Sequence, residues 1–129
     1  MHPTWQRNLG RTLSAIALLF LAFDGGGKVA GLAPFVEGTT RLGFAASAVP
    51  VIGVLEVAGV LLYAIPATAP LGAVVLTGHL GGAVATHVRL GSPLFTHTLF
   101  PVYVAAFVWI GLFLRSPRVR ALVSMSEVP

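Results

Sequence analysis

The sequence predicts an all-α fold, an antiparallel bundle of four transmembrane helices that forms one domain over residues 1–129 with both termini cytoplasmic. The first observation is composition: 56% of the residues are hydrophobic, 9% are charged, and the mean hydropathy is +0.89, unlike an ordinary soluble domain. The second is that the apolar residues gather into four blocks, each near the ~20 residues needed to cross a hydrocarbon core. The third is that arginines concentrate at both ends of the chain, and basic flanks mark the cytoplasmic side.

The transmembrane spans are expected at about residues 12–30, 47–65, 71–88 and 99–114. Ser47 suits the N-cap of the second span and Pro50 its first turn, where a missing N–H costs nothing. An uncharged turn at Pro66–Pro70 makes the second and third spans an antiparallel hairpin.

The remaining segments are expected to be short connections. Residues 31–46 form a mixed loop that has room for a short interfacial helix, and residues 92–98 form a second loop. The tail from Ser124 to Pro129 is expected to fray. A cleaved signal peptide is the competing interpretation of the first span, but Asp24 and Lys28 fall where a cleavage site needs small residues.

Composition also excludes several classes of function. The chain contains no cysteine, which removes disulfides, thiolate metal sites and dithiol redox chemistry. The basic residues lack the aromatic interleaving of a nucleic-acid surface, so the bilayer is the expected partner and nucleic acid is not. No catalytic residue is assigned, and the chain is predicted to be a binding protein rather than an enzyme.

Five ionisable residues fall at membrane depth, and they are the predicted ligand-binding pocket: Asp24, Lys28, Glu56, His79 and His87. A charged side chain at a helix centre costs about 2.5–3.5 kcal/mol on insertion scales, so these groups must face the bundle interior. Counted from the helix ends, they occupy its middle and outer half. The binding interpretation therefore places a polar pocket there.

Simpler roles remain open for the same residues. Asp24 and Lys28 lie one helical turn apart, where a salt bridge would neutralise both. Glu56 has no charged partner at three or four residues on either side, so it either pairs across helices with Lys28 or His79, or is protonated because burial disfavours its charge. An intramembrane histidine is also a common interhelical hydrogen-bonding group.

The histidines do not suggest a metal site. His79 and His87 are eight residues apart, hence about 12 Å along a helix axis, too far to hold one ion together. A metal site would have to recruit Asp24 and Glu56 across helices, and no local ligand spacing supports one, so no metal is expected. His97 and His2 are expected to be interfacial or exposed. Gly78 and Gly82 form a small-x-x-x-small pair that predicts close helix packing, within the bundle or between protomers.

Several runs resemble the DoxX-like family of small four-helix membrane proteins: Leu19–Gly25 with Lys28, Gly53–Glu56, and above all Leu76–Arg89 leading into Gly91 and Pro93–Phe95. The resemblance extends from about Leu13 to Arg118. It implies a four-span bundle in a bacterial inner membrane with cytoplasmic termini. It also implies that some relatives take part in quinone-coupled oxidation of sulfur compounds or in membrane oxidoreductase assemblies, and that distant ones assist the assembly of receptor channels.

Three functions follow as hypotheses. The first is binding of an amphipathic molecule, a lipid or a quinone being the candidate ligand or cofactor. The second is a subunit of a quinone-coupled oxidoreductase, in which His79 or Glu56 relays protons. The third is an assembly or chaperone subunit that docks on a partner membrane protein; a homodimer is also open. A proton-coupled transporter is a weaker fourth, because four short spans leave little room for alternating access.

Overall fold

Helices account for all the regular structure of residues 3–124, which are the residues that the computed structural model describes. No strand occurs in this part of the chain, which confirms the predicted all-α class. The helices are α1 (Thr4–Val29), α2 (Ala33–Arg41), α3 (Val49–Ala64), α4 (Ala69–Leu90), α5 (Phe100–Arg115) and α6 (Pro117–Val123). A 3-10 turn at Ala46–Ala48 precedes α3, and a π-helical turn at Leu94–Thr98 precedes α5.

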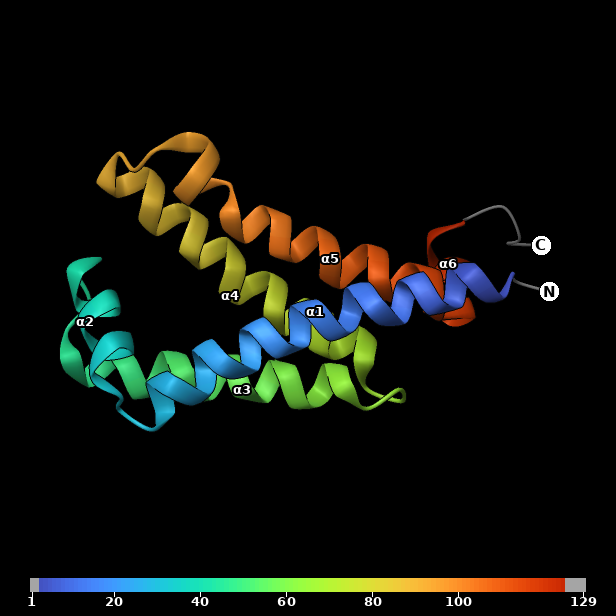
Figure 1. The fold of residues 1–129 in the computed structure, drawn as a ribbon, viewed down its shortest axis with the longest axis horizontal. Coiled ribbons are helices and arrows are strands. Elements are labelled where there is room, and N and C mark those ends of the chain that lie inside the picture. Colours follow the sequence, from blue (N-terminus) through green and yellow to red (C-terminus); the bar gives the residue numbers. More distant parts are fainter. Residues whose placement is uncertain (1–2, 125–129) are drawn as a thin grey trace.

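The four long helices form a ring in the order α1, α3, α4, α5. Each packs against its two neighbours in this ring, and neighbours run in opposite directions, so the antiparallel bundle is confirmed. In Figure 1 the α1–α3 pair and the α4–α5 pair diverge toward the end where α2 lies. The start of α1 and helix α6 are both at the other end of the bundle.

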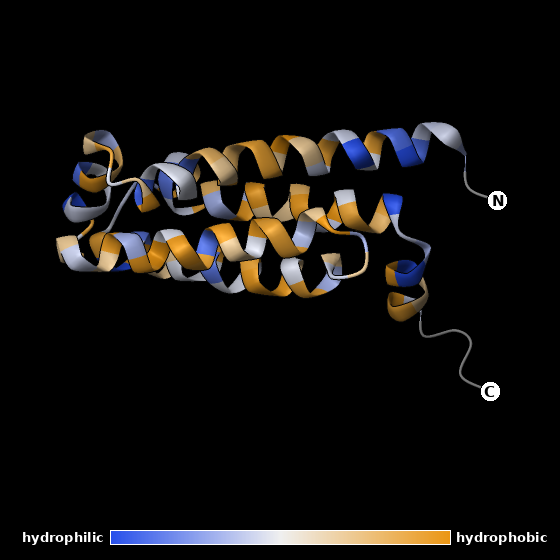
Figure 2. Cartoon of the chain, turned by 90° about the horizontal axis from the view of Figure 1, so that it is seen from below, coloured by the Kyte–Doolittle hydropathy of each residue, from blue (hydrophilic) through white to orange (hydrophobic). Residues whose placement is uncertain are grey.

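Four segments are long and apolar enough to cross a membrane: Thr4–Val29, Ala46–Ala64, Ala69–Leu90 and Leu94–Arg115. Apolar residues cover much of the length of these helices (Figure 2). Large hydrophobic side chains are exposed on the outside of the bundle, among them Leu19, Phe23, Val51, Leu61, Val74 and Ile110. Because a charged residue, Glu56, is fully buried inside while these side chains face outward, the natural solvent of the surface is lipid. The chain is a membrane protein with four transmembrane helices.

The tightest packing lies in the half of the bundle near α6. Tyr63 of α3 is fully buried, and its hydroxyl donates to the carbonyl of Val108 on α5 at 2.7 Å. The same hydroxyl lies 2.8 Å from Ser14 Oγ on α1, and Arg115 Nε donates to that serine at 2.9 Å. This network joins three helices at one end and leaves the opposite end free to open.

The boundaries differ from the predicted ones in several places. Helix α1 begins at Thr4 rather than near residue 12. The predicted N-cap at Ser47 is wrong: Ser47 lies inside the 3-10 turn, which runs directly into α3, and Ala48 is the N-cap, without a side-chain hydrogen bond. Pro50 does lie in the first turn of α3.

Two connections also contain structure that was not predicted. The supposed loop at 92–98 includes the π-helical turn, in which the amide of Thr98 donates to the carbonyl of Pro93 at 3.1 Å. Helix α6 follows the last span, because Ser116 caps it and Pro117 fits its first turn. The short helix expected between the first two spans is confirmed as α2. His2 and the tail beyond Ser124 lie outside the described residues.

Candidate intramembrane binding site

A cavity of about 610 Å³ occupies the half of the bundle where the helix pairs diverge. Helices α1, α3, α4 and α5 form its walls, and α2 contributes Phe35 and Thr39. All the residues predicted to form a pocket line it: Asp24, Lys28, Glu56, His79 and His87. Asp24, Lys28, Glu56 and His79 lie close to one another, whereas His87 lines the cavity further along α4.

Lys28 is shared between two carboxylates. Its Nζ lies 2.5 Å from Asp24 Oδ2, one turn earlier on α1, and 3.1 Å from Glu56 Oε2 on α3. The Glu56 side chain is fully buried, whereas 12% of the Lys28 side chain and 31% of the Asp24 side chain are exposed. Asp24 thus pairs with Lys28 within its own helix, and Glu56 pairs with the same lysine across helices.

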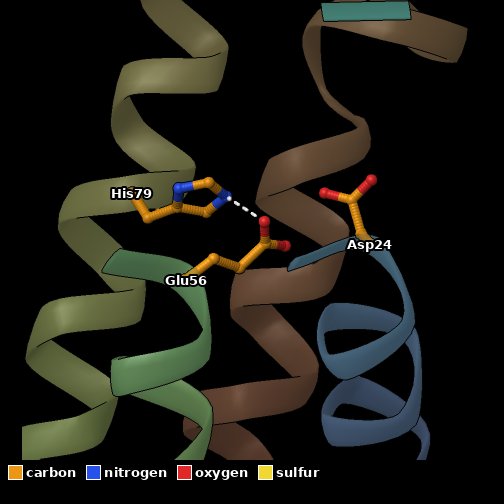
Figure 3. A group of neighbouring side chains, drawn as sticks. All are labelled: Asp24, Glu56 and His79. Carbon is orange, nitrogen blue, oxygen red and sulfur yellow. Dashed lines mark ion pairs between the residues drawn. The ribbon is translucent and has the colours of Figure 1, made fainter. Parts of the chain in front are cut away.

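His79 of α4 completes the cluster. Its Nε2 lies 3.5 Å from Glu56 Oε2, the same oxygen that faces Lys28. Figure 3 shows Asp24, Glu56 and His79 pointing toward one another from α1, α3 and α4. We call these three residues with Lys28 the polar cluster.

Close contact between α1 and α3 brings the cluster together. A Cβ atom at Gly53 would lie 2.8 Å from Lys28 Cβ and 3.0 Å from the carbonyl oxygen of Gly25, so only glycine lets the two backbones approach this far. Glu56 is three residues beyond Gly53 and projects from the same side of α3. The glycine therefore sets the distance that Glu56 spans to Lys28.

One carboxylate oxygen in the cluster lacks a partner. Among the described residues no group donates to Glu56 Oε1, although this atom is buried. An unsatisfied buried polar atom costs about 1–3 kcal/mol, and such atoms often mark a place where a ligand or water binds. The free oxygen thus distinguishes the cluster from a closed structural ion pair.

Asp24, Glu56 and His79 are also a plausible metal set by chemistry, since one ligand atom from each lies within 4.8 Å of the others. His87 does not belong to this group, in line with the predicted separation of the two histidines. However, the Lys28 ammonium already contacts both carboxylates, and it would repel a metal ion placed beside them. The expectation of no metal stays a prediction.

His87 lies apart from the cluster. Its Nδ1 is 3.0 Å from Ser92 Oγ, and its ring meets that of His97 edge to face at 5.9 Å between centroids. His97 is exposed, as predicted. His87 therefore contributes to the cavity wall near the end of α4 rather than to the charge cluster.

The predicted packing role of Gly78 and Gly82 is wrong within this chain. Both glycines are exposed, and a Cβ atom at either would meet nothing within 4 Å. They line the cavity instead, leaving space beside His79. The small-x-x-x-small spacing did not distinguish the two outcomes, because small residues let helices pack closely and also leave room for a cavity. Packing between two copies of the chain stays a prediction.

The apolar part of the cavity was not predicted. Residues of α2 and of the segment after α2 line the cavity. Four phenylalanines also line it: Phe20, Phe35, Phe44 and Phe100. Phe20 and Phe100 meet edge to face at 5.3 Å between ring centroids. Apolar residues are common in every span, so no sequence signal separates those facing the cavity from those facing lipid.

The segment that follows α2 is tied to the end of α4. Arg89 Nη2 donates to the carbonyl of Leu42 at 2.8 Å, and Leu42 lines the cavity. Replacing Arg89 by glutamine should lower the free energy of local opening of this segment by about 1 kcal/mol, the usual net contribution of a hydrogen bond. Amide hydrogen exchange of residues 33–44 should then be several-fold faster. Arg41→Gln, a change at an exposed arginine on α2, should leave exchange unchanged; equal effects of the two variants would contradict the assignment.

The profile of the DoxX-like family matches residues 12–111, a segment that includes every residue of the polar cluster. The chain belongs to the DoxX-like family. No curated protein and no solved structure matches it. The resemblance seen in the sequence is confirmed, and in this DoxX-like protein the family segment extends from within α1 into α5.

Proposed function

We propose that this DoxX-like protein binds a small amphipathic molecule, lipid-like or quinone-like, inside the membrane. One observation carries the proposal: a buried carboxylate with an unsatisfied oxygen forms part of the wall of an otherwise largely apolar cavity of about 610 Å³. Ligand sites typically enclose about 300–1,000 Å³ and combine apolar walls with a few placed polar groups. The polar part of the ligand lies at the polar cluster, and its apolar part lies against the phenylalanines.

The proposed location follows from the arginines. Arg7, Arg11, Arg115, Arg118 and Arg120 all belong to the end of the bundle where α1 starts and α6 lies. The other half holds the remaining three basic residues, Lys28, Arg41 and Arg89. By the positive-inside rule, we propose that both termini are cytoplasmic and that the cavity lies in the outer half of the membrane. Membership of the DoxX-like family supports a bacterial inner membrane as the location.

The test uses two neighbouring glycines on α4. Gly82 lines the cavity whereas Gly81 does not, and a Cβ atom at either meets nothing within 4 Å. Gly82→Leu should fill the cavity and reduce co-purifying small molecule by about tenfold or more, while Gly81→Leu should retain it. Native mass spectrometry after extraction in a mild neutral detergent measures the bound species.

Both leucine variants should fold, because replacing an unpacked glycine within a helix improves helix propensity by several tenths of a kcal/mol. Thermal melting in detergent checks this. A protein that carries no defined molecule, or one that carries equal amounts in both variants, would contradict the proposal.

A quinone-coupled oxidoreductase subunit is the second candidate. The observation that favours it is the 3.5 Å approach of His79 to Glu56, a pair suited to accept and pass on the protons of a quinol. Quinone among the co-purifying molecules, together with quinone reduction by the purified protein and a sulfur donor, would support this candidate. Bound lipid without such activity would leave only the binding function.

A further inference from the structure

The ionisable groups that line the cavity do not balance in charge. Two acids, Asp24 and Glu56, face one lysine, Lys28, and the described lining contains no other aspartate, glutamate, lysine or arginine. Counted with histidines uncharged, the convention that gives the whole chain its formal charge of +4, the wall carries a formal charge of −1. A net charge in a low-dielectric interior is costly unless a counter-ion accompanies it.

The charges nearest to the cavity outside its lining do not remove this imbalance. Glu37 and Arg41 lie on the exposed face of α2, and Arg89 is exposed with its guanidinium on the Leu42 carbonyl. Water and ions screen exposed charges, so these groups affect the cluster weakly. The buried acids therefore depend on Lys28 and on whatever enters the cavity.

The carboxylates are also the groups that a ligand would meet. Asp24 is the most exposed member of the cluster, at 31%, against 12% for Lys28 and 15% for His79. Lys28 directs its ammonium to Asp24 Oδ2 and Glu56 Oε2, leaving the second oxygen of each acid without it. Glu56 Oε1, buried and without a donor, is one of these free oxygens. The wall consequently offers acceptors and negative charge.

The apolar lining favours the same sign of ligand charge. Four phenylalanines contribute to the wall, and the faces of aromatic rings attract ammonium groups. An anionic head at the polar cluster would meet two carboxylates, with Lys28 already engaged by both. A neutral hydroxyl would satisfy a free oxygen but would leave the excess charge.

We infer that the molecule bound in this cavity carries a protonated amine, so that its head serves as a second cation beside Lys28; this inference rests on the proposed binding function. The amine donates hydrogen bonds to the free carboxylate oxygens, and its hydrocarbon chain follows the phenylalanines. The chemical class is a cationic amphiphile rather than a fatty acid or a neutral alcohol.

Three photoreactive probes test this, identical in a diazirine-bearing sixteen-carbon chain and different only in the head: amine, alcohol or carboxylate. Each is titrated against the purified protein in neutral detergent, and mass spectrometry quantifies labelling of the cavity residues. We expect half-maximal labelling by the amine at a concentration at least about tenfold below that of the alcohol, the size of one charge-assisted hydrogen bond, with the carboxylate weakest.

Two matched variants assign the preference to the cluster. Asp24→Asn brings the formal charge of the wall to zero at nearly constant shape, and it should reduce the amine-to-alcohol preference to about two-fold or less. Glu37→Gln removes an acid outside the cavity and should leave the preference intact. Alcohol labelling and thermal melting show whether each variant is folded.

The outcomes separate the inference from the proposed function. Amine and alcohol binding equally well, carboxylate binding best, or a preference that survives in folded Asp24→Asn would each overturn the cationic head while keeping a binding cavity. If none of the three probes labels cavity residues, or if Gly82→Leu does not reduce their labelling, both fail. A tenfold amine preference lost in Asp24→Asn and kept in Glu37→Gln supports the inference.

Discussion

Lys28→Met is expected to lower the free energy of unfolding by about 3–5 kcal/mol, the range observed when one partner of a buried ion pair is removed. The Lys28 ammonium lies 2.5 Å from Asp24 and 3.1 Å from Glu56, and the Glu56 side chain is fully buried. Methionine preserves most of the volume but leaves Glu56 with the Asp24 carboxylate nearby and His79 as its one remaining partner in the cluster. Titration of the protein from neutral detergent into dodecyl sulfate, followed by circular dichroism, measures the loss.

A second change should rescue the first. In Lys28→Met/Glu56→Gln the buried carboxylate is absent, so most of the lost stability should return, because no unpaired acid is left at that position. Arg11→Met is the control, because Arg11 is exposed on α1 and its replacement should cost within about 0.5 kcal/mol. A Lys28→Met protein as stable as the control would show that Glu56 does not depend on the lysine.

The part of the site that the sequence predicted is the part on which lipid imposes a large cost. Asp24, Lys28, Glu56 and His79 lie on three helices, and only Asp24 and Lys28 are near each other in the sequence. A charged side chain that faces hydrocarbon costs several times more free energy than one apolar side chain gains there. The helix orientation that turns the charged side chains inward is therefore strongly favoured. That constraint turns the polar cluster inward, and the close approach of α1 and α3 at Gly53 sets the distances within it.

The features that were missed are those for which the alternatives differ little in free energy. A phenylalanine such as Phe20 or Phe100 has a similar free energy facing lipid or facing an apolar cavity, so hydropathy does not tell these two environments apart. The Gly78 and Gly82 spacing fits a packed interface and an open cavity equally well, and the structure shows the open one. Helix α6 and the first turns of α1 lie outside the apolar runs of the sequence, in polar and basic segments. The length of an apolar run therefore does not indicate where these helical segments begin or end.

Gly72→Ala is expected to be the most damaging single-methyl change on α4. A Cβ atom at Gly72 would overlap the backbone nitrogen of Tyr63 and lie 2.6 Å from its Cα and 2.8 Å from the carbonyl carbon of Leu62. Backbone atoms have no alternative rotamer, so α3 and α4 must separate. The expected loss is about 3 kcal/mol or more, the upper end of the overpacking range, by the same dodecyl sulfate titration.

The same substitution elsewhere on α4 should have the opposite sign. Gly81 faces open space, so Gly81→Ala should stabilise the protein by up to about 1 kcal/mol through helix propensity. Separation of α3 from α4 at Gly72 would also move His79 relative to Glu56, because these two residues lie further along the same two helices. Gly72→Ala should therefore weaken binding in the cavity as well as stability. If Gly72→Ala unfolds at the same dodecyl sulfate concentration as Gly81→Ala, the α3–α4 contact at Gly72 does not hold His79 and Glu56 in place.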